Sequence, residues 1–254
     1  MSKLYRLLPL LLLLSCGKSK EPAPITLLSY NVGVFSKYED DTTPQVADVI
    51  RSSGATLVAL NELDSCNRRH ATYQLKELAT TLGDWSFQFA SAFPYAGGAY
   101  GNGVVSKDKV TNRYKVHLPK SDGSEPRSIA VVETARCVFA AVHLDYVGEN
   151  SRRDQVKALN DWFKAVYVGT KKPVFLCGDF NAEPDSETIA LMREGWTQLS
   201  AADNTYSTTN PRKCIDYVFA YKNAAPVEVV SSEVLTTGTG TLSDHFPVKV
   251  VVKF

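Results

Sequence analysis

The chain lacks a surplus of basic charge. Its 28 Lys and Arg residues face 27 Asp and Glu residues, so the formal net charge is +1. Proteins that bind duplex DNA without regard to sequence usually carry a basic surplus, because neutralising phosphates supplies most of that affinity. The near-neutral balance argues against tight, non-specific DNA binding, although it leaves room for a local basic patch.

Cysteine is also scarce, with five residues and no Cys-x-x-Cys pair, so no zinc site is indicated. Cys137 and Cys177 lie in apolar, strand-like runs and are expected to be small buried side chains. Cys66 and Cys214 lie in polar loops, where a disulfide is allowed in an exported chain but is not required. No internal repeat or low-complexity segment divides the sequence, and one large domain is therefore expected.

No apolar run reaches the roughly 20 residues that a membrane-spanning helix requires. The apolar block Leu7–Leu14 follows two basic residues, Lys3 and Arg6, and has the length of the apolar core of a secretory signal. The block ends in Leu13-Leu14-Ser15-Cys16, which resembles a bacterial lipobox with Cys16 as the lipidated first residue. An uncleaved apolar N-terminus with an incidental cysteine is the alternative.

These signals divide the chain into three expected parts: a lipoprotein signal peptide over residues 1–15, a tether over 16–24 and a domain over 25–254. Cleavage would remove two of the 28 basic residues and no acidic one, which leaves 26 against 27 and a net charge of about −1. We expect a lipid-anchored monomer in the bacterial cell envelope, on the periplasmic or outer-membrane face.

Short apolar or alternating runs bounded by turn residues dominate the domain, and they predict many β-strands. Strands are expected at residues 25–32, 56–60, 85–90, 103–106, 113–118, 128–134, 137–144, 173–180, 214–221, 227–235 and 246–252. Amphipathic stripes predict helices at 44–53, 72–82, 152–167 and 186–193, with Thr43 and Ser151 as the N-caps of the first and third. Two sheets packed face to face, with helices outside, would cover every apolar face.

Polar side chains stand at the ends of several of these strands. Asp179 and Asn181 follow the apolar run 173–177, and because alternate strand residues point the same way they can face one reacting group together. Similar positions are held by Asn31, Glu62, Asp216, Asp244 and His245. Each alone has an ordinary explanation, since Asp and Asn are common turn residues. Together they predict a site for a divalent metal and a phosphate ester.

Six motifs carry a resemblance over about residues 25–254: Ser29-Tyr30-Asn31, Asn61-Glu62, His143-Leu144, Gly178-Asp179-Phe180-Asn181, Ile215-Asp216-Tyr217 and Ser243-Asp244-His245-Phe246-Pro247. Their order resembles that of the endonuclease/exonuclease/phosphatase superfamily, which has the DNase I-like fold. The resemblance implies an α/β, four-layer sandwich of two packed, mainly antiparallel β-sheets flanked by helices. It also implies Mg²⁺-dependent hydrolysis of a phosphoester, with Mn²⁺ as a possible substitute.

The resemblance also implies roles for the strand-end residues. Glu62 resembles the principal metal ligand, with Asn31 and Asp244 near it. Asp179 resembles the residue that orients or deprotonates the attacking water, and Asn181 would hydrogen-bond the transition state. Asp216 and His245 resemble the Asp–His pair of the family, and His143 the residue that contacts the phosphate, although a lone histidine is more often structural. Weaker substrate contacts are implied for Arg68 (or its neighbour Arg69), Asn102, Arg127 and Tyr206.

The substrate is left open by the sequence. The segment Arg212–Tyr217 lacks the Trp, and the Arg after Asp, of the inositol-polyphosphate 5-phosphatase signature, which disfavours that subgroup. An exported phosphodiesterase, phosphatase or nuclease is expected, with a nucleic acid, a phospholipid head group or a small molecule as its phosphate-ester partner. The alternative is a non-catalytic, surface-binding lipoprotein on the same scaffold, because a fold alone does not establish chemistry.

Overall fold

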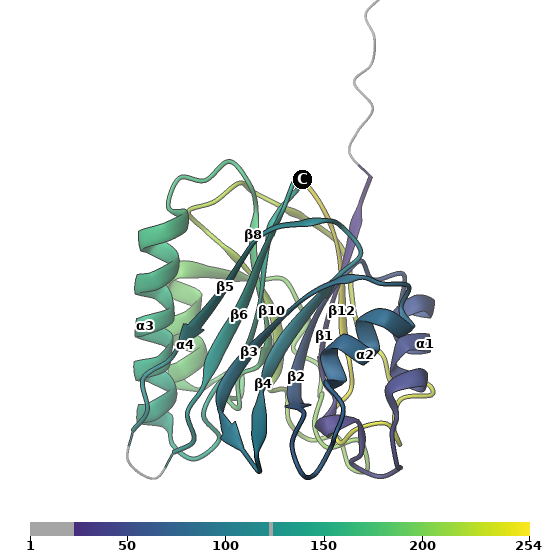
Figure 1. The fold of residues 1–254 in the computed structure, drawn as a ribbon. Helices are drawn as coiled ribbons and strands as arrows, with labels where there is room; N and C mark the ends of the chain where they lie inside the picture. Colours follow the sequence, from purple (N-terminus) through teal and green to yellow (C-terminus); the bar gives the residue numbers. More distant parts are fainter. Residues whose placement is uncertain (1–22, 122–123) are drawn as a thin grey trace, which may run out of the picture.

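The computed structural model describes residues 23–121 and 124–254, and it consists of two six-stranded sheets packed face to face with helices outside (Figure 1). The expected signal peptide, Cys16 and most of the tether lie outside the described residues. Within the described ranges, no helix is long and apolar enough to cross a membrane.

The first sheet has the order β11-β12-β1-β2-β4-β3, with strands Glu228–Val234, Val248–Lys253, Ile25–Asn31, Leu57–Ser65, Gly98–Ser106 and Ser86–Tyr95. The second has the order β5-β6-β7-β8-β10-β9, with strands Val110–His117, Ser128–Thr134, Val138–His143, Val174–Asp179, Asp216–Tyr221 and Trp196–Gln198. Among the strand pairs that the described residues form, only β1–β2 and β7–β8 are parallel. The predicted α/β sandwich of mainly antiparallel sheets is confirmed.

The two parallel pairs depend on helical crossovers, because parallel neighbours cannot be joined by a tight turn. Helix α1 (Thr43–Ser53) connects β1 to β2, and α3 (Glu149–Tyr167) connects β7 to β8. With α2 (Gln74–Thr81), α1 covers the outer face of the first sheet, and α3 with α4 (Glu187–Gly195) covers the second (Figure 1). Both strands of each parallel pair therefore end at the same edge of their sheet.

Alternation along each strand separates the core into layers. Leu27 of β1, Phe175 of β8 and Val218 of β10 belong to the buried cluster between the sheets. Leu28 and Leu176, one residue further along, belong instead to the two clusters beneath the helices. At one end of β1, β7, β8 and β10, the residue that faces the other sheet is polar instead of apolar. These residues are Asn31, His143, Asp179 and Asp216.

Several element boundaries differ from the sequence-based prediction. Helix α1 has Thr42, not Thr43, in the N-cap position, and α3 begins at Glu149, which makes Ser151 a buried residue of its first turn. Strand β4 begins at Gly98 because its glycines allow a close approach: a Cβ on Gly101 would lie 2.1 Å from the carbonyl oxygen of Ala90. The short strand β9 and a 3₁₀ turn, η1 (Gly33–Phe35), were not predicted.

The four cysteines of the described ranges are free thiols, so the allowed Cys66–Cys214 disulfide is not formed. Cys137 and Cys177 are buried, as their apolar surroundings predicted.

Candidate active-site cleft

A cleft of about 790 Å³ opens at the edge where both parallel pairs end. Its lining is mostly polar and charged, and it includes Glu62, Arg127, His143, Asp179, Asn181, Tyr206, Asp244 and His245. The register explains this gathering, because His143 of β7 and Asp216 of β10 both pair with Asp179 of β8. The strand pairing thus holds His143 and Asp216 on either side of Asp179, the last residue of β8.

Asn31 links the two sheets at this edge. Its Nδ2 donates to Oε1 of Glu62 and to Oδ2 of Asp179, each at 3.1 Å, while its Oδ1 accepts from the backbone N–H of Gly33 at 3.2 Å. In this arrangement the amide nitrogen faces the carboxylates. Asn31 therefore orients the two acidic groups, and its predicted role as a metal ligand would require the amide to turn and give up the Gly33 bond.

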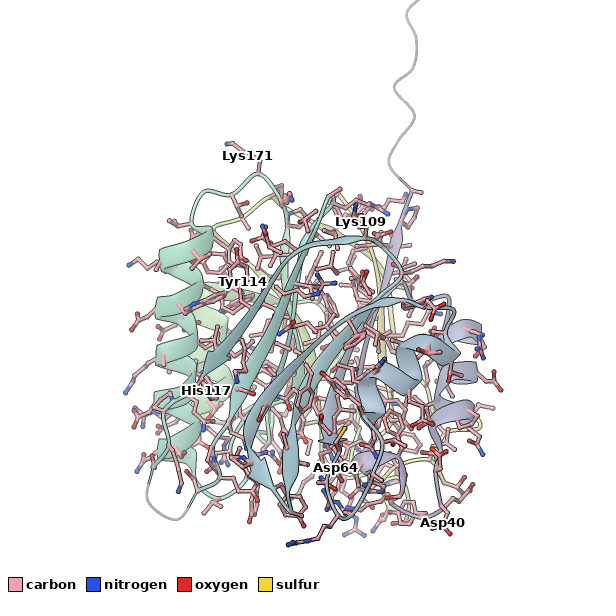
Figure 2. The ribbon with its side chains drawn as sticks, viewed as in Figure 1. Asp40, Asp64, Lys109, Tyr114, His117 and Lys171 are labelled. Atoms are coloured by element: carbon pink, nitrogen blue, oxygen red, sulfur yellow. The ribbon has the colours of Figure 1, made fainter. Side chains whose placement is uncertain are left out.

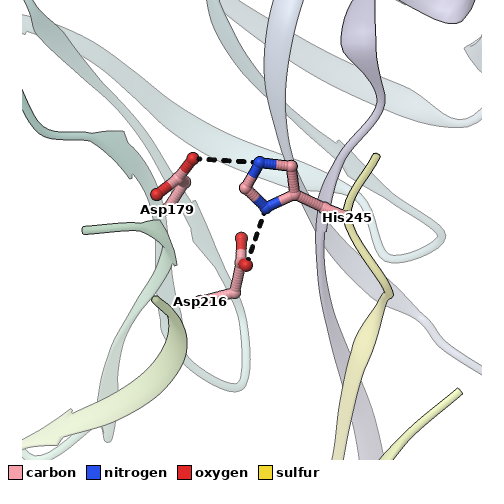
Figure 3. A group of neighbouring side chains, drawn as sticks. All are labelled: Asp179, Asp216 and His245. Carbon is pink, nitrogen blue, oxygen red and sulfur yellow. Dashed lines mark hydrogen bonds and ion pairs between the residues drawn. The ribbon is translucent and has the colours of Figure 1, made fainter. Parts of the chain in front are cut away.

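Asp179, His245 and Asp216 form a buried row, with the imidazole between the two carboxylates (Figure 3). His245 Nδ1 lies 2.8 Å from Oδ2 of Asp216, and its Nε2 lies 3.6 Å from Oδ2 of Asp179. Thr205 Oγ1 also donates to Asp216, at 2.6 Å. Burial by itself lowers the pKa of His245, but the charges of Asp216 and Asp179 outweigh it and raise that pKa to about 10. His245 is therefore an imidazolium at neutral pH.

The pKa of the Asp179 carboxyl is also raised, but here burial is the main cause. Burial, and then the charge of Asp216, raises the pKa of Asp179 above its ordinary value, against the stabilising effects of His245, the Asn181 N–H and Asn31. A raised carboxyl pKa moves its proton exchange toward neutral pH, which suits a general base.

His143 differs from His245 although both line the cleft. Its Nε2 lies 3.4 Å from Oδ2 of Asp179, and its buried Nδ1 has no hydrogen-bond partner among the described residues. Burial, and then the charges of Arg127 and His245, lower its pKa well below the ordinary value. The cleft therefore holds one neutral and one charged imidazole.

Glu62 and Asp244, the two carboxylates predicted to hold a metal ion, both line the cleft. Glu62 sits at a bulge of β2 with φ +58°, a strained conformation for a side-chain-bearing residue. Asp244 Oδ1 is buried without a partner among the described groups. Carboxylate oxygens with free capacity fit Mg²⁺ or Mn²⁺. Asp179, Asp216 and His245 also lie within 4.8 Å of one another, but their facing atoms already bond to each other or to Asn31.

The remaining predicted site residues divide into two groups. Asn181 lines the cleft with φ +48°, its N–H donating to Oδ1 of Asp179 at 2.8 Å. Tyr206 packs its ring against His245 with centroids 4.8 Å apart. Arg127, 2% exposed, faces the cleft with only a 3.3 Å ion pair to Glu125, and its Nε has no partner within the described ranges.

Two predicted substrate contacts do not line the cleft. Asn102 is buried between the sheets, where its Nδ2 donates to the carbonyl of Ser128 at 2.7 Å and its Oδ1 faces Asn61. Arg68 is exposed on the loop after β2, and the neighbouring Arg69 is held by two bonds to Asp64, a residue labelled in Figure 2. Both corrections have one cause: a motif position does not reveal which way its side chain points.

Sequence reasoning named Asn61 as part of the Asn61-Glu62 motif but gave it no role in the site. Its Oδ1 accepts from the Asp179 N–H at 3.0 Å, and its Nδ2 donates to the Val142 carbonyl at 2.8 Å, so it joins β2 to both strands of the second parallel pair. Strand alternation was the available signal, because Asn61 has the inner-face parity of Leu57 and Ala59. Lys37 also lines the cleft and was not predicted as a site residue. No sequence pattern indicated it, because it follows the irregular turn η1.

The fold and this cleft together identify the class of protein. The sequence matches the model of the Endonuclease/Exonuclease/phosphatase family over residues 28–245, and the chain belongs to that family. Members of this superfamily are phosphoester hydrolases.

Solved structures of the family resemble the chain over most of its length. An endonuclease/exonuclease/phosphatase from Beutenbergia cavernae has a TM-score of 0.74 at 20% identity, covering 92% of this chain and 72% of that one. A mannosyl-6-phosphatase from Bacteroides thetaiotaomicron has a TM-score of 0.72 at 18% identity, covering 91% and 100%. The human Nocturnin catalytic domain, with bound sulfate, has a TM-score of 0.71 at 20% identity, covering 91% and 93%. At these identities the likeness establishes the fold. No functionally curated protein matches the sequence.

Proposed function

We propose that this protein is a divalent-metal-dependent phosphoric ester hydrolase of the bacterial cell envelope, anchored through a lipid on Cys16. The observation that carries the proposal is the buried Asp179–His245–Asp216 row, which Asn31 joins to Glu62 in one cleft. A surface-binding protein without chemistry has no need of a buried imidazolium between two carboxylates, because burying these charges is costly.

Each group has a defined part in an in-line attack of water on phosphorus. Asp179 accepts the proton of the attacking water, and Asn31 and the Asn181 N–H hold its carboxylate in place. The imidazolium of His245 and the spare N–H groups of Arg127 bind the phosphoryl oxygens. Asp216 and Thr205 keep His245 charged and oriented. A Mg²⁺ or Mn²⁺ ion held by Glu62 and Asp244 would polarise a phosphoryl oxygen and stabilise the leaving oxygen.

The charges around the cleft favour a small phosphoester over a duplex nucleic acid. Four basic residues line it, and four carboxylates beyond the predicted machinery balance them; the basic residues are Lys37, Arg127, Arg152 and Lys213, and the carboxylates are Glu125, Glu149, Glu183 and Asp185. Such a rim lacks the basic surplus that binds a chain of phosphates, but its carboxylates can accept hydrogen bonds from substrate hydroxyl groups. One solved relative is named a mannosyl-6-phosphatase, which agrees with a phosphorylated polyol as substrate.

The test is hydrolysis by the mature chain, residues 16–254, of bis-p-nitrophenyl phosphate and of a panel of sugar phosphates, plasmid DNA, RNA and sphingomyelin-like lipids. Activity should require Mg²⁺ or Mn²⁺ and stop with EDTA. Asp179→Ala and His245→Ala should each lower kcat by roughly 10²-fold or more. Asp154→Asn, an exposed change on α3, is the matched control. Full activity of both alanine variants would refute the proposed mechanism.

A further inference from the structure

Lys37 reaches the carboxylates of the candidate metal site from outside the sheets. Its Nζ lies 2.7 Å from Oδ2 of Asp244, and Lys37, Glu62 and Asp244 all line the cleft. Burial by itself lowers the pKa of Lys37, but the bond to Asp244 and the charges of Asp244 and Glu62 outweigh it and raise that pKa. The ammonium thus pairs directly with Asp244 and lies within the electrostatic influence of Glu62.

This pairing is incomplete. The carboxylate of Asp244 has room for several hydrogen bonds, yet its Oδ1 is buried and has no partner in the described parts of the chain. A buried acceptor without a partner destabilises the folded protein. The arrangement is therefore suited to a ligand that brings more positive charge and more bonding capacity than one ammonium does.

The backbone before Lys37 is strained and firmly held. Gly33, Val34 and Phe35 have φ of 51°, 51° and 55°, and a positive φ is unusual for a β-branched residue such as Val34. Gln74 Nε2 donates to the Val34 carbonyl at 2.6 Å, and the Thr42 N–H donates to the Phe35 carbonyl at 2.7 Å. Strained segments of this kind persist where surrounding bonds enforce them, typically at functional sites.

A divalent cation and an ammonium cannot share these carboxylates without strong repulsion. The side chain of Lys37 is 41% exposed, so its flexible stem has room to move within the cleft. Once Asp244 is taken, a phosphate group in the same cleft offers the ammonium another anionic partner, because Lys37 and the catalytic row line one cleft.

From these contacts we propose that Lys37 is a mobile cation of the site: it neutralises Glu62 and Asp244 before a metal ion binds, and afterwards it binds the substrate phosphate. The inference rests on the proposed metal-dependent hydrolysis. It assigns a phosphate-binding residue that the sequence did not indicate. It also predicts opposite effects of Lys37 on the affinities for metal and for phosphate.

The experiment uses the full-length chain in detergent and two titrations that need no turnover. Isothermal titration calorimetry measures Mn²⁺ binding to the EDTA-stripped protein, and then binding of inorganic phosphate to the Mn²⁺-loaded protein. The variants are Lys37→Met and Lys37→Arg, with Lys109→Met as control. Lys109 is exposed at the end of the molecule opposite Asp64 (Figure 2). Thermal denaturation checks that each variant folds.

We expect Lys37→Met to bind Mn²⁺ about tenfold more tightly and phosphate about tenfold more weakly than the wild type. Lys37→Arg keeps the charge and should keep the weaker Mn²⁺ affinity, and Lys109→Met should match the wild type. If Lys37→Met binds Mn²⁺ no more tightly than the wild type, or binds phosphate equally well, the inference about Lys37 is overturned while the proposed function stands. A wild type that binds no Mn²⁺ would overturn the proposed function and this inference with it.

Discussion

Replacing Asp216 with Asn should remove the charge that keeps His245 protonated. The two side chains are both buried, and Nδ1 of His245 lies 2.8 Å from Oδ2 of Asp216. Asn has the same shape and can still accept the Thr205 bond, so the change acts mainly on charge. A carboxylate this close favours the charged imidazole strongly, and we expect the pKa of His245 to fall by about 2, or roughly 3 kcal/mol.

The pH dependence of stability follows from the sign of this effect. The pKa of His245 is raised in the folded protein, so the pair contributes its full stabilisation below the pKa of an unfolded histidine, about 6.5. That contribution is lost as the pH rises from there toward the folded value of about 10. In Asp216→Asn the loss of stability over this range should be less than half as large, because the folded pKa then lies about 1.5 above the unfolded value instead of about 3.5.

Long-range ¹H–¹⁵N NMR of the histidine side chains measures the pKa directly, and only four histidines have to be assigned. The titration is run in EDTA so that protein groups alone contribute, and urea unfolding at neutral and alkaline pH measures the stability. Asp154→Asn is the control for loss of one carboxylate at an exposed position. If His245 titrates at the same pH in Asp216→Asn as in the wild type, Asp216 is not what holds the proton there.

Two further predictions concern the contacts between the sheets and the proposed membrane anchor. Asn61→Ala removes the buried hydrogen bonds to the Asp179 N–H and the Val142 carbonyl, and it should lower the free energy of unfolding in urea by about 2–4 kcal/mol. The exposed change Asn112→Ala is the control and should lower it little. Equal losses of stability in the two variants would refute the bridging role of Asn61. Cys16→Ser should abolish incorporation of labelled palmitate and release the protein from the membrane fraction, and continued labelling would place the lipid elsewhere.

Strand alternation made most of the fold predictable, and it located the polar residues at the strand ends. The alternation also carried a signal that the sequence-based prediction did not use. Asn31, Asp179 and Asp216 each lie an even number of residues from inner-face apolar residues of their strands, so they too face inward. Local pattern could not give the bulge that turns Glu62 toward the cleft, since a bulge shifts the alternation by one residue. It also could not give the direction of Asn102, whose amide is used between the sheets.

Lys37 marks the limit of prediction from sequence. No periodicity runs through residues 33–41, and the position of the ammonium depends on three left-handed residues held by Gln74 and Thr42, which lie later in the chain. The carboxylate that it contacts, Asp244, comes from the loop before β12, and Glu62, whose charge also acts on it, comes from β2; both are distant from Lys37 in sequence. A contact of this kind exists only once the sheet has formed.

The site and the packing of the two sheets depend on the same residues. Asn31 and Asn61 belong to neighbouring parallel strands of the first sheet, and both reach Asp179 in the second. Because each bond crosses the interface, any shift of one sheet against the other moves Asp179 relative to Glu62. The loops that surround the cleft can therefore change, and with them the substrate, without moving the reacting groups, because the inner-face residues at the strand ends hold those groups in register.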